Sequence, residues 1–275
     1  MKVLVLGGNG MAGHMIVKYL KADPALQVHY TTRNEDKESI SFDAIDFKQI
    51  DLIIEKLRPD VVINCIGILN QAVDDHIYDA IIVNSLLPHH LVRQLDLYGG
   101  KLIHISTDCV FSGQKGNHLE SDVKDGQTAY ARTKALGEVN KESHLTIRTS
   151  IIGPEIKNNG IGLLQWFLKQ TGTIKGYQQV WWNGVTTLEL AKFIRYAIDQ
   201  DFGGLYHLSA NEPINKYELL VQFKNYFFKD DVEIIPDTEI YSNKVLINTR
   251  HDIEYEGKDY PEMLEELRDW MSLNG

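Results

Sequence analysis

The chain has 275 residues, 43% of them hydrophobic, and a formal net charge of −10 at pH 7. This content of apolar residues supports a large buried core and excludes an intrinsically disordered chain. The acidic balance, without any block of Lys or Arg, argues against a surface for duplex nucleic acid, because phosphate binding needs clustered positive charge.

The N-terminus and the cysteines indicate the cellular setting. The opening stretch "MKVLVLGG" lacks the apolar core and the cleavage site of a signal peptide, and no run approaches the roughly 18 apolar residues of a membrane span. The two cysteines, Cys65 and Cys109, give neither a disulfide framework nor a metal-binding spacing. We expect a soluble cytoplasmic protein, monomeric or homodimeric, with no nucleic-acid, membrane or metal partner.

Short apolar runs alternate with longer amphipathic ones through the first 150 residues. The predicted strands are Lys2–Leu6, Gln27–Thr32, Asp60–Ile66, Lys101–Ser106 and Leu145–Thr149. The predicted helices are Met11–Lys21, Phe47–Leu57, Ile77–Leu97 and Ala129–Glu142. This alternation is typical of βαβ units and predicts an α/β fold with a Rossmann-type, doubly wound parallel sheet. The strands show little alternation of polarity, as expected when helices cover both faces of a sheet.

The alternation stops after Gly153-Pro154. Later elements are predicted as helices near 163–170, 188–199 and 261–271 and a strand at 204–210. We predict that residues 1–152 and 184–210 form the Rossmann domain. Residues 153–183 and 211–275 are expected to form a smaller C-terminal mixed α/β lobe, and a cleft between the two would hold the substrate.

A glycine-rich loop joins the first predicted strand to the first helix. Gly7 allows the tight turn, Gly10 lets backbone amides approach a pyrophosphate at the helix N-terminus, and Gly13 allows close packing of helix on strand. The pattern therefore predicts a bound dinucleotide. Its G-x-x-G-x-x-G spacing resembles the extended branch of the short-chain dehydrogenase/reductase superfamily.

The second strand indicates which dinucleotide. A carboxylate about 20 residues past the glycines would bind the free 2′-hydroxyl of NAD, but residues 29–34 contain none, whereas Arg33 can pair with a 2′-phosphate. We therefore predict NADPH, with NADH left possible by the nearby Glu35. Asp43 lies where extended members of the superfamily place an acid on the adenine amine.

The segments "ISTDCVFSG" and "YARTK" contain the predicted catalytic residues. Tyr130 and Lys134 are four residues apart in a run of helix formers, so they project from one face. The Lys134 charge is expected to lower the pKa of Tyr130 and to hold the nicotinamide ribose. Thr107, at the C-terminal end of a strand, is the second donor to the reacting oxygen. The set predicts reduction of a ketone, with Tyr130 as the proton donor.

Several segments together resemble dTDP-4-dehydrorhamnose reductase and related nucleotide-sugar reductases. They are "RPDVVINCIG", "HISTDCVFSG", "LESD", "AYARTKALGE", "IRTSIIG" and "GLYHLSA". The resemblance runs from residue 1 to about residue 210. It implies NADPH-dependent reduction of the 4-keto group of a nucleoside-diphosphate 6-deoxy sugar, with Thr107, Tyr130 and Lys134 as the catalytic set. Val83, Asn84 and Arg148 also lie in segments that match the family.

The glycine loop, the strand ends and the resemblance together give the expected ligand-contacting residues. For the cofactor they are Gly7, Asn9, Gly10, Met11, Ala12, Gly13, Arg33, Asp43, Ala44, Asn64, Cys65, Ile66, Gly67, Ile105, Ser106, Tyr130, Lys134, Ser150 and Ile151. For the substrate they are Thr107, Asp108, Cys109, Trp182 and Asn183.

The chain departs from the rhamnose enzymes around the sugar. Cys109 stands where these enzymes usually have tyrosine, and residues 182–187, "WNGVTT", replace the family's Gln-Phe-Gly-Ala-Pro-Thr. The tail also lacks the family's Arg-Pro-rich pattern. A UDP-linked 4-keto-6-deoxy-N-acetylhexosamine is therefore preferred as substrate over one of the dTDP-4-dehydrorhamnose type. Trp181 and Trp182 are candidates for stacking on the base, or core aromatics.

Three other functions share this fold. A 4,6-dehydratase needs Asp-Glu after the threonine, and Asp108-Cys109 lacks the Glu. An epimerase/reductase of the GDP-fucose synthase type has a cysteine at the position of Cys109 but also needs a histidine acid, and none lies between His144 and His207. The regulatory β subunit of methionine adenosyltransferase binds NADP as a partner protein. The missing Glu and the missing histidine favour simple reduction over the first two, and the intact Thr107, Tyr130 and Lys134 favour it over a purely regulatory role.

Overall fold

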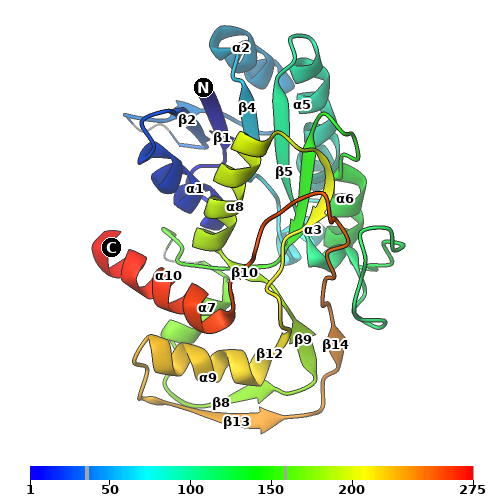
Figure 1. The fold of residues 1–275 in the computed structure, drawn as a ribbon. Helices are drawn as coiled ribbons and strands as arrows, with labels where there is room; N and C mark the ends of the chain where they lie inside the picture. The colour runs from blue at the N-terminus through cyan, green and yellow to red at the C-terminus, as the bar shows by residue number, and fades with distance from the viewer. Residues whose placement is uncertain (35–36, 158–159, 275) are drawn as a thin grey trace.

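A seven-stranded parallel sheet forms the centre of the molecule (Figure 1). The structure is a computed structural model that describes residues 1–34, 37–157 and 160–274. The strands are β1 (Lys2–Leu6), β2 (Gln27–Thr32), β3 (Ile40–Ser41), β4 (Val61–Asn64), β5 (Lys101–Thr107), β6 (Leu145–Thr149) and β11 (Gly204–His207). Their order is β11-β6-β5-β4-β1-β2-β3, and each neighbouring pair is parallel. The order reverses between β4 and β1, so the predicted doubly wound Rossmann-type sheet is confirmed.

Helices cover both faces of the sheet, as the uniformly apolar strands predicted. Successive residues of β1 point to opposite faces: Val3 and Val5 pack in a core with α1 (Met11–Lys21) and α8 (Thr187–Gln200). Leu4 and Leu6 pack in a second core with α2 (Phe47–Leu57) and α5 (Leu87–Asp96).

The predicted helix 77–97 forms as three consecutive helical segments. They are α4 (Ile77–Ala80), the π-helical turn η1 (Ile81–Leu86) and α5. The Leu87 N–H donates to the Ile82 carbonyl at the end of the π turn, and Pro88 stands in the first turn of α5, where its missing N–H is tolerated. The short helix α3 (Gln71–Asp75) before them was not predicted.

The helix α6 (Ala129–Gly137) lies against this π turn. A Cβ on Gly137 would lie 1.9 Å from the Asn84 carbonyl oxygen, so only glycine allows this approach. The predicted extension of α6 to Glu142 is wrong, because Glu138 leaves the helix with ψ 125°. Its carboxylate is thereby free to turn toward the sheet.

A smaller group of elements follows β6 and lies at the lower end of the molecule in Figure 1. The helices are α7 (Leu163–Leu168), α9 (Lys216–Tyr226) and α10 (Tyr260–Asn274). The strands are β7 (Ile151–Ile152), β8 (Gly172–Tyr177), β9 (Val180–Trp182), β10 (Val185–Thr186), β12 (Ile214–Asn215), β13 (Val232–Asp237) and β14 (Ser242–Asn243). They pair as β7 with β10, β8 with β13, and β9 with both β12 and β14. The exact division into two domains stays a prediction.

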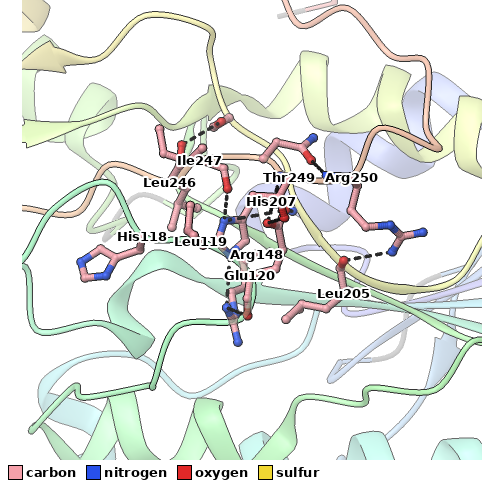
Figure 2. Close-up of polar contacts among 12 residues, drawn as sticks. His118, Leu119, Glu120, Arg148, Leu205, His207, Leu246, Ile247, Thr249 and Arg250 are labelled. Atoms are coloured by element: carbon pink, nitrogen blue, oxygen red, sulfur yellow. Dashed lines mark hydrogen bonds and ion pairs between the residues drawn. The ribbon is translucent and has the colours of Figure 1, made fainter.

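Residues 243–252, here called the return segment, lead from this group back to the sheet (Figure 2). His118 N–H donates to the Val245 carbonyl, and Ile247 N–H donates to the His118 carbonyl, each at 2.8 Å. Thr249 donates its backbone N–H and its hydroxyl to one oxygen of the Glu120 carboxylate, at 3.1 and 2.7 Å. The return segment thus closes over the loop that follows β5.

A buried ion pair joins α6 to the sheet. Arg148 of β6 donates Nε to one oxygen of Glu138 at 2.7 Å and a terminal nitrogen to the other at 2.9 Å, and the two side chains are 3% and 4% exposed. The Ser106 hydroxyl donates to the same carboxylate at 2.7 Å. Burial acts to raise the pKa of Glu138, but the bonds from Arg148 outweigh it and leave that pKa below its ordinary value.

His207 at the end of β11 extends this network (Figure 2). Its Nδ1 donates to the Ile247 carbonyl at 2.9 Å, and its Nε2 accepts from a terminal nitrogen of Arg148 at 3.1 Å. Burial lowers the pKa of His207 to about 4, which keeps the ring neutral and lets Nε2 accept.

None of the helices in the described residues has the length and the apolar content that crossing a membrane would need.

The variant Arg148→Met tests the buried ion pair. It removes the buried partner of Glu138 and leaves this carboxylate only the partly exposed Lys124 ammonium, at 3.1 Å, so the free energy of unfolding should fall by about 3 kcal/mol. Urea denaturation at pH 7 measures the change. As a matched control, Arg268→Met removes an arginine from an exposed pair on α10 and should cost less than about 1 kcal/mol. Equal losses in the two variants would contradict the role assigned to Arg148.

Candidate active site

The C-terminal end of β5 and the start of α6 bring the predicted catalytic residues together. Thr107 is the last residue of β5, at the edge where open parallel sheets build their sites. The Thr128 hydroxyl accepts the Ala131 N–H at 3.1 Å and caps α6, which begins at Ala129. Tyr130 and Lys134 then lie one turn apart on this helix, as the spacing predicted.

Tyr130 lies close enough to Thr107 for the threonine side chain to act on the pKa of its phenol. The Thr107 oxygen also accepts the Cys109 N–H at 3.1 Å, and the Thr107 hydroxyl donates to Asp108 at 3.2 Å. Burial raises the pKa of Tyr130, the Cys109 thiol adds to the rise, and the bond with Thr107 only partly opposes it. The expectation that Lys134 lowers the pKa of Tyr130 is therefore wrong for this structure.

Lys134 lies buried beneath the site. Its ammonium donates to the Ile105 carbonyl at 2.7 Å, which fixes its position below the end of β5. Burial lowers the pKa of Lys134 to about 8, while the charge of Glu138 acts in the opposite direction. The neighbouring Cys65 is half-buried, and loss of solvation raises its pKa to about 12, so it is a neutral thiol.

The glycine loop has the shape of an anion-binding turn. Gly7 has φ 82°, and a Cβ on Gly13 would lie 2.1 Å from the Gly7 carbonyl oxygen, so both positions need glycine. Gly10 precedes α1 without a side-chain cap, and the first turn of α1 holds no acidic residue. The first N–H groups of a helix have no partner within the helix, so this N-terminus can accept a phosphate.

The other predicted cofactor residues differ in what they contact. Arg33 and Asp43 are exposed at the ends of the strand and loop beyond β2, and Glu35 lies outside the described residues. The Asn64 side chain is used within the chain, since it contacts His104 and accepts the Ile66 N–H.

Two residues that the sequence analysis named, Asn84 and Ser106, use their side chains to hold other parts of the chain in place. Asn84 of the π turn binds the N–H and the carbonyl of Ile68, each at 2.9 Å, and so holds the loop after β4 in place. The Ser106 hydroxyl, predicted to line the cofactor, points to Glu138 on the opposite face from Thr107. Only its backbone remains available to a ligand. The backbone carbonyl of Ser150 accepts the Val185 N–H at 2.8 Å.

The predicted substrate residues fall into two groups. Asp108 and Cys109 form a short 3-10 turn directly after Thr107 and border the site. The Asn183 amide is engaged within the chain, because it donates to the carbonyls of Ala210 and Leu246 and accepts the Leu246 N–H. Its side chain joins β9 to the return segment, and its contact with substrate stays a prediction.

Two lysines that the sequence did not indicate lie on the same side of the site. Lys244 Nζ lies 3.3 Å from the Cys109 sulfur, and Lys216 Nζ lies 3.5 Å from the centre of the Trp182 ring. The face of Trp182 is thus already covered by a cation, and its ring is 3% exposed. No motif that the sequence analysis used contains either lysine. Among the described residues, no cluster of His, Cys, Asp or Glu could hold a metal ion.

The structure combines a parallel doubly wound sheet, a glycine loop after β1 and a Tyr-x-x-x-Lys pair beside the end of β5. These are the features on which the sequence resembles the extended short-chain dehydrogenases/reductases. The family model described as the RmlD substrate binding domain matches residues 1–240. The chain belongs to this family, which confirms the resemblance to dTDP-4-dehydrorhamnose reductases and classes the protein with nucleotide-sugar oxidoreductases.

Individual relatives are distant. Methionine adenosyltransferase 2 subunit beta of Xenopus tropicalis is 22% identical over 254 residues, which are 86% of this chain and 75% of that protein. The spore coat polysaccharide biosynthesis protein SpsK of Bacillus subtilis is 26% identical over 254 residues, 88% of this chain and 85% of that protein.

Among solved structures, the fold is shared with dTDP-4-dehydrorhamnose reductases. The enzyme of Clostridium acetobutylicum superposes with a TM-score of 0.84 at 24% identity, over 99% of this chain and 100% of that chain. The enzyme of Bacillus anthracis, in complex with NADP, superposes with a TM-score of 0.82 at 19% identity, over 97% and 98% of the two chains.

The pH dependence of stability tests the burial of Lys134. Below pH 8 the ammonium is charged in the folded and unfolded chains, and burial penalises the folded one. As pH rises from about 8 toward the ordinary lysine value near 10.4, the folded chain loses this proton first and the penalty disappears. Wild type should therefore gain about 3 kcal/mol relative to Lys134→Met across this range. Denaturant titrations of both proteins at several pH values measure it, and a constant difference would contradict the burial of a charged Lys134.

Proposed function

We propose that this chain is an NADPH-dependent reductase of the 4-keto group of a nucleoside-diphosphate 6-deoxy sugar. The observation that carries the proposal is the proximity of Thr107 and Tyr130 at the end of β5, with the buried Lys134 one helical turn from Tyr130. A UDP-linked 4-keto-6-deoxy-N-acetylhexosamine is the preferred substrate, with a dTDP-4-dehydrorhamnose type as the other choice. The name of SpsK, a polysaccharide biosynthesis protein, supports this substrate class.

The cofactor site fits NADPH. The uncapped N-terminus of α1 and the three glycines would take the pyrophosphate. Arg33 is exposed and would pair with the 2′-phosphate, and Lys134 would hold the nicotinamide ribose. The NADP complex of the Bacillus anthracis relative supports this choice. NADH is the alternative cofactor.

The residues of the chain then supply the proton chemistry. When bound, the reduced nicotinamide supplies the hydride that reduces the ketone carbon. Thr107 and Tyr130 hold the ketone oxygen, and Tyr130 donates the proton that the developing alkoxide needs. Because burial raises the pKa of Tyr130, the phenol is protonated at neutral pH, which is the form a reductase requires. Lys134, one turn below, orients the site through its bond to the Ile105 carbonyl.

The protonation of Cys109 favours simple reduction over epimerisation. An epimerase base must be a thiolate, but burial and the charge of Asp108 raise the pKa of Cys109 to about 11. At neutral pH the group is a thiol. We therefore assign Cys109 to the wall of the sugar pocket and keep the epimerase/reductase of the GDP-fucose synthase type as an alternative.

A second candidate is a non-catalytic, NADP-binding regulatory subunit. Several curated relatives are methionine adenosyltransferase 2 subunit beta, from Xenopus, zebrafish and mammals. This reading gives Thr107, Tyr130 and Lys134 no chemical task, whereas they are arranged for one. It predicts cofactor binding without turnover.

Turnover of 4-keto sugars separates the two candidates. Purified protein with NADPH should reduce at least one of a panel of UDP-, dTDP- and GDP-linked 4-keto-6-deoxy sugars. The loss of NADPH absorbance measures turnover, and NMR identifies the product. Tyr130→Phe removes the proton donor and should lower kcat by about 100- to 10,000-fold without loss of NADPH binding. Tyr78→Phe, at a 74% exposed position, is the control. NADPH binding without turnover of any sugar would favour the regulatory subunit, whereas unchanged turnover in Tyr130→Phe would overturn the role of Tyr130 as proton donor.

The variant Arg33→Ala tests the cofactor choice. Loss of the charge should raise the Kd of NADPH by about 10- to 100-fold, because a charge-assisted contact with phosphate disappears, and should leave the Kd of NADH unchanged. Fluorescence titration measures both constants. Arg93→Ala, which removes an exposed arginine from α5, controls for net charge. If Arg33→Ala changed the Kd of NADPH and the Kd of NADH equally, Arg33 would not be a contact of the 2′-phosphate.

A further inference from the structure

The Lys134 ammonium is buried beneath the site, and its hydrogen bond is to a neutral group. Lys134 is 4% exposed, and it donates to the backbone carbonyl of Ile105 at 2.7 Å. Within the described ranges of the chain, it forms no ion pair with a carboxylate. A buried ammonium without a compensating charge tends to lose its proton. A group farther from Lys134 must therefore help to keep it charged.

Glu138 supplies a negative charge from one turn further along the chain. Neighbouring residues of β5 hold the two side chains, because the Ile105 carbonyl accepts from Lys134 and the Ser106 hydroxyl donates to Glu138 at 2.7 Å. The Glu138 side chain is 4% exposed, so little water screens its charge. In the described part of the chain, Glu138 is the one carboxylate whose charge acts on Lys134.

The other described groups that face Lys134 are neutral. His104 of β5 and Cys65 after β4 lie close enough for the Lys134 charge to act on them, and Tyr130 precedes Lys134 by one turn of α6. Burial lowers the pKa of His104 well below its ordinary value and raises the pKa of Tyr130, and loss of solvation raises the pKa of Cys65 to about 12. The charge on Lys134 thus depends on Glu138.

Glu138 can act as a counter-charge because it stays ionised. Arg148 donates to both oxygens of its carboxylate, and Lys124 Nζ lies 3.1 Å from one of them. These cations favour the deprotonated carboxylate, and they also screen part of its charge from Lys134. The Lys124 side chain is 34% exposed, so its charge can be removed without opening the buried pair of Arg148 and Glu138.

The charge of Lys134 matters for the proposed function. A charged ammonium forms stronger hydrogen bonds than a neutral amine, and Lys134 is expected to bind the hydroxyls of the nicotinamide ribose. We propose that Glu138 is a positioning residue for the cofactor: its carboxylate keeps the Lys134 ammonium charged at neutral pH, and so able to hold the ribose. This inference rests on the proposed function.

The titration of Lys134 tests the assignment without any cofactor. In the full chain labelled with ¹³C at the lysine Cε atoms, the NMR signal that disappears in Lys134→Met identifies this residue. Glu138→Gln removes the charge but still offers an oxygen to Arg148, and it should lower the midpoint of the Lys134 titration by about 1 pH unit. Glu138→Asp keeps the charge, so its midpoint should lie closer to that of wild type than to that of Glu138→Gln.

A substitution with the opposite effect separates charge from packing. Lys124→Met removes a cation that screens Glu138, so it should raise the midpoint of the Lys134 titration by about 0.3 pH unit. Lys115→Met removes an exposed lysine that pairs with Asp122 instead, and it should leave the midpoint unchanged. A loss of packing alone would not move the midpoint down in Glu138→Gln and up in Lys124→Met.

The affinity for NADPH should follow the same titration. Burial lowers the pKa of Lys134 to about 8 in wild type, so at pH 8 about half of the chains hold the charged amine, against about a tenth in Glu138→Gln. The Kd of NADPH at pH 8 should therefore be about fivefold higher in Glu138→Gln than in wild type. At pH 6.5, where Lys134 is mostly charged in both proteins, the two Kd values should agree within about twofold. Fluorescence titration measures them.

Each outcome has a distinct meaning. If wild type binds neither NADPH nor NADH, the proposed function fails and the inference fails with it. If wild type binds NADPH and Glu138→Gln leaves both the Lys134 midpoint and the Kd at pH 8 unchanged, only the inference is overturned. An equal rise of the Kd at pH 6.5 and at pH 8 would also overturn it, because this would show a packing defect. If Glu138→Gln does not fold, an unchanged midpoint in Lys124→Met would overturn the inference.

Discussion

The buried pairing of Arg148 with Glu138 is the interaction on which the arrangement of the site depends. It joins β6 to the residue that follows α6, and its carboxylate also accepts the Ser106 hydroxyl of β5. Ser106 precedes Thr107, and Glu138 lies one turn beyond Lys134. One ion pair thus fixes the distance between the strand end and the helix that supply the proposed catalytic groups.

The same network extends from the sheet to the C-terminal part of the chain. Arg148 donates to the neutral ring of His207, which in turn donates to the Ile247 carbonyl of the return segment. A charge buried beneath the reacting residues therefore also positions the segment that contains Lys244. Because several hydrogen bonds satisfy both charged partners, this polar core can be rigid without leaving an uncompensated group.

Local patterns in the sequence were enough to predict the sheet and the motif residues. The apolar runs of β1, β2, β4, β5 and β6 and the spacing of Gly7, Gly10 and Gly13 depend on neighbours along the chain, and the structure forms these strands and this loop, whereas the two-residue β3 was not predicted. The spacing of Tyr130 and Lys134 likewise set their common face. The end of α6 was missed, because what stops the helix is the distant partner of Glu138 and no local signal.

Long-range pairing could not be predicted in the same way. The positions of Asn183, Lys216 and Lys244 follow from contacts between segments separated by tens of residues, in strands of two or three residues that carry almost no periodic signal. The pKa of Tyr130 was misjudged for a related reason. Burial depends on the packing of the whole site, whereas the spacing to Lys134 gave only a local charge.

The return segment also has a consequence for the order in which the site can form. Its contacts with His118 and Glu120 join residues that are more than one hundred positions apart in the sequence. Such distant contacts form slowly, because a long loop must close before they stabilise anything. During synthesis, the glycine loop and the Thr107–Tyr130 pair emerge from the ribosome long before Lys244 does. A nascent chain would thus present its glycine loop and the helix α6 well before the return segment could close over the loop that follows β5.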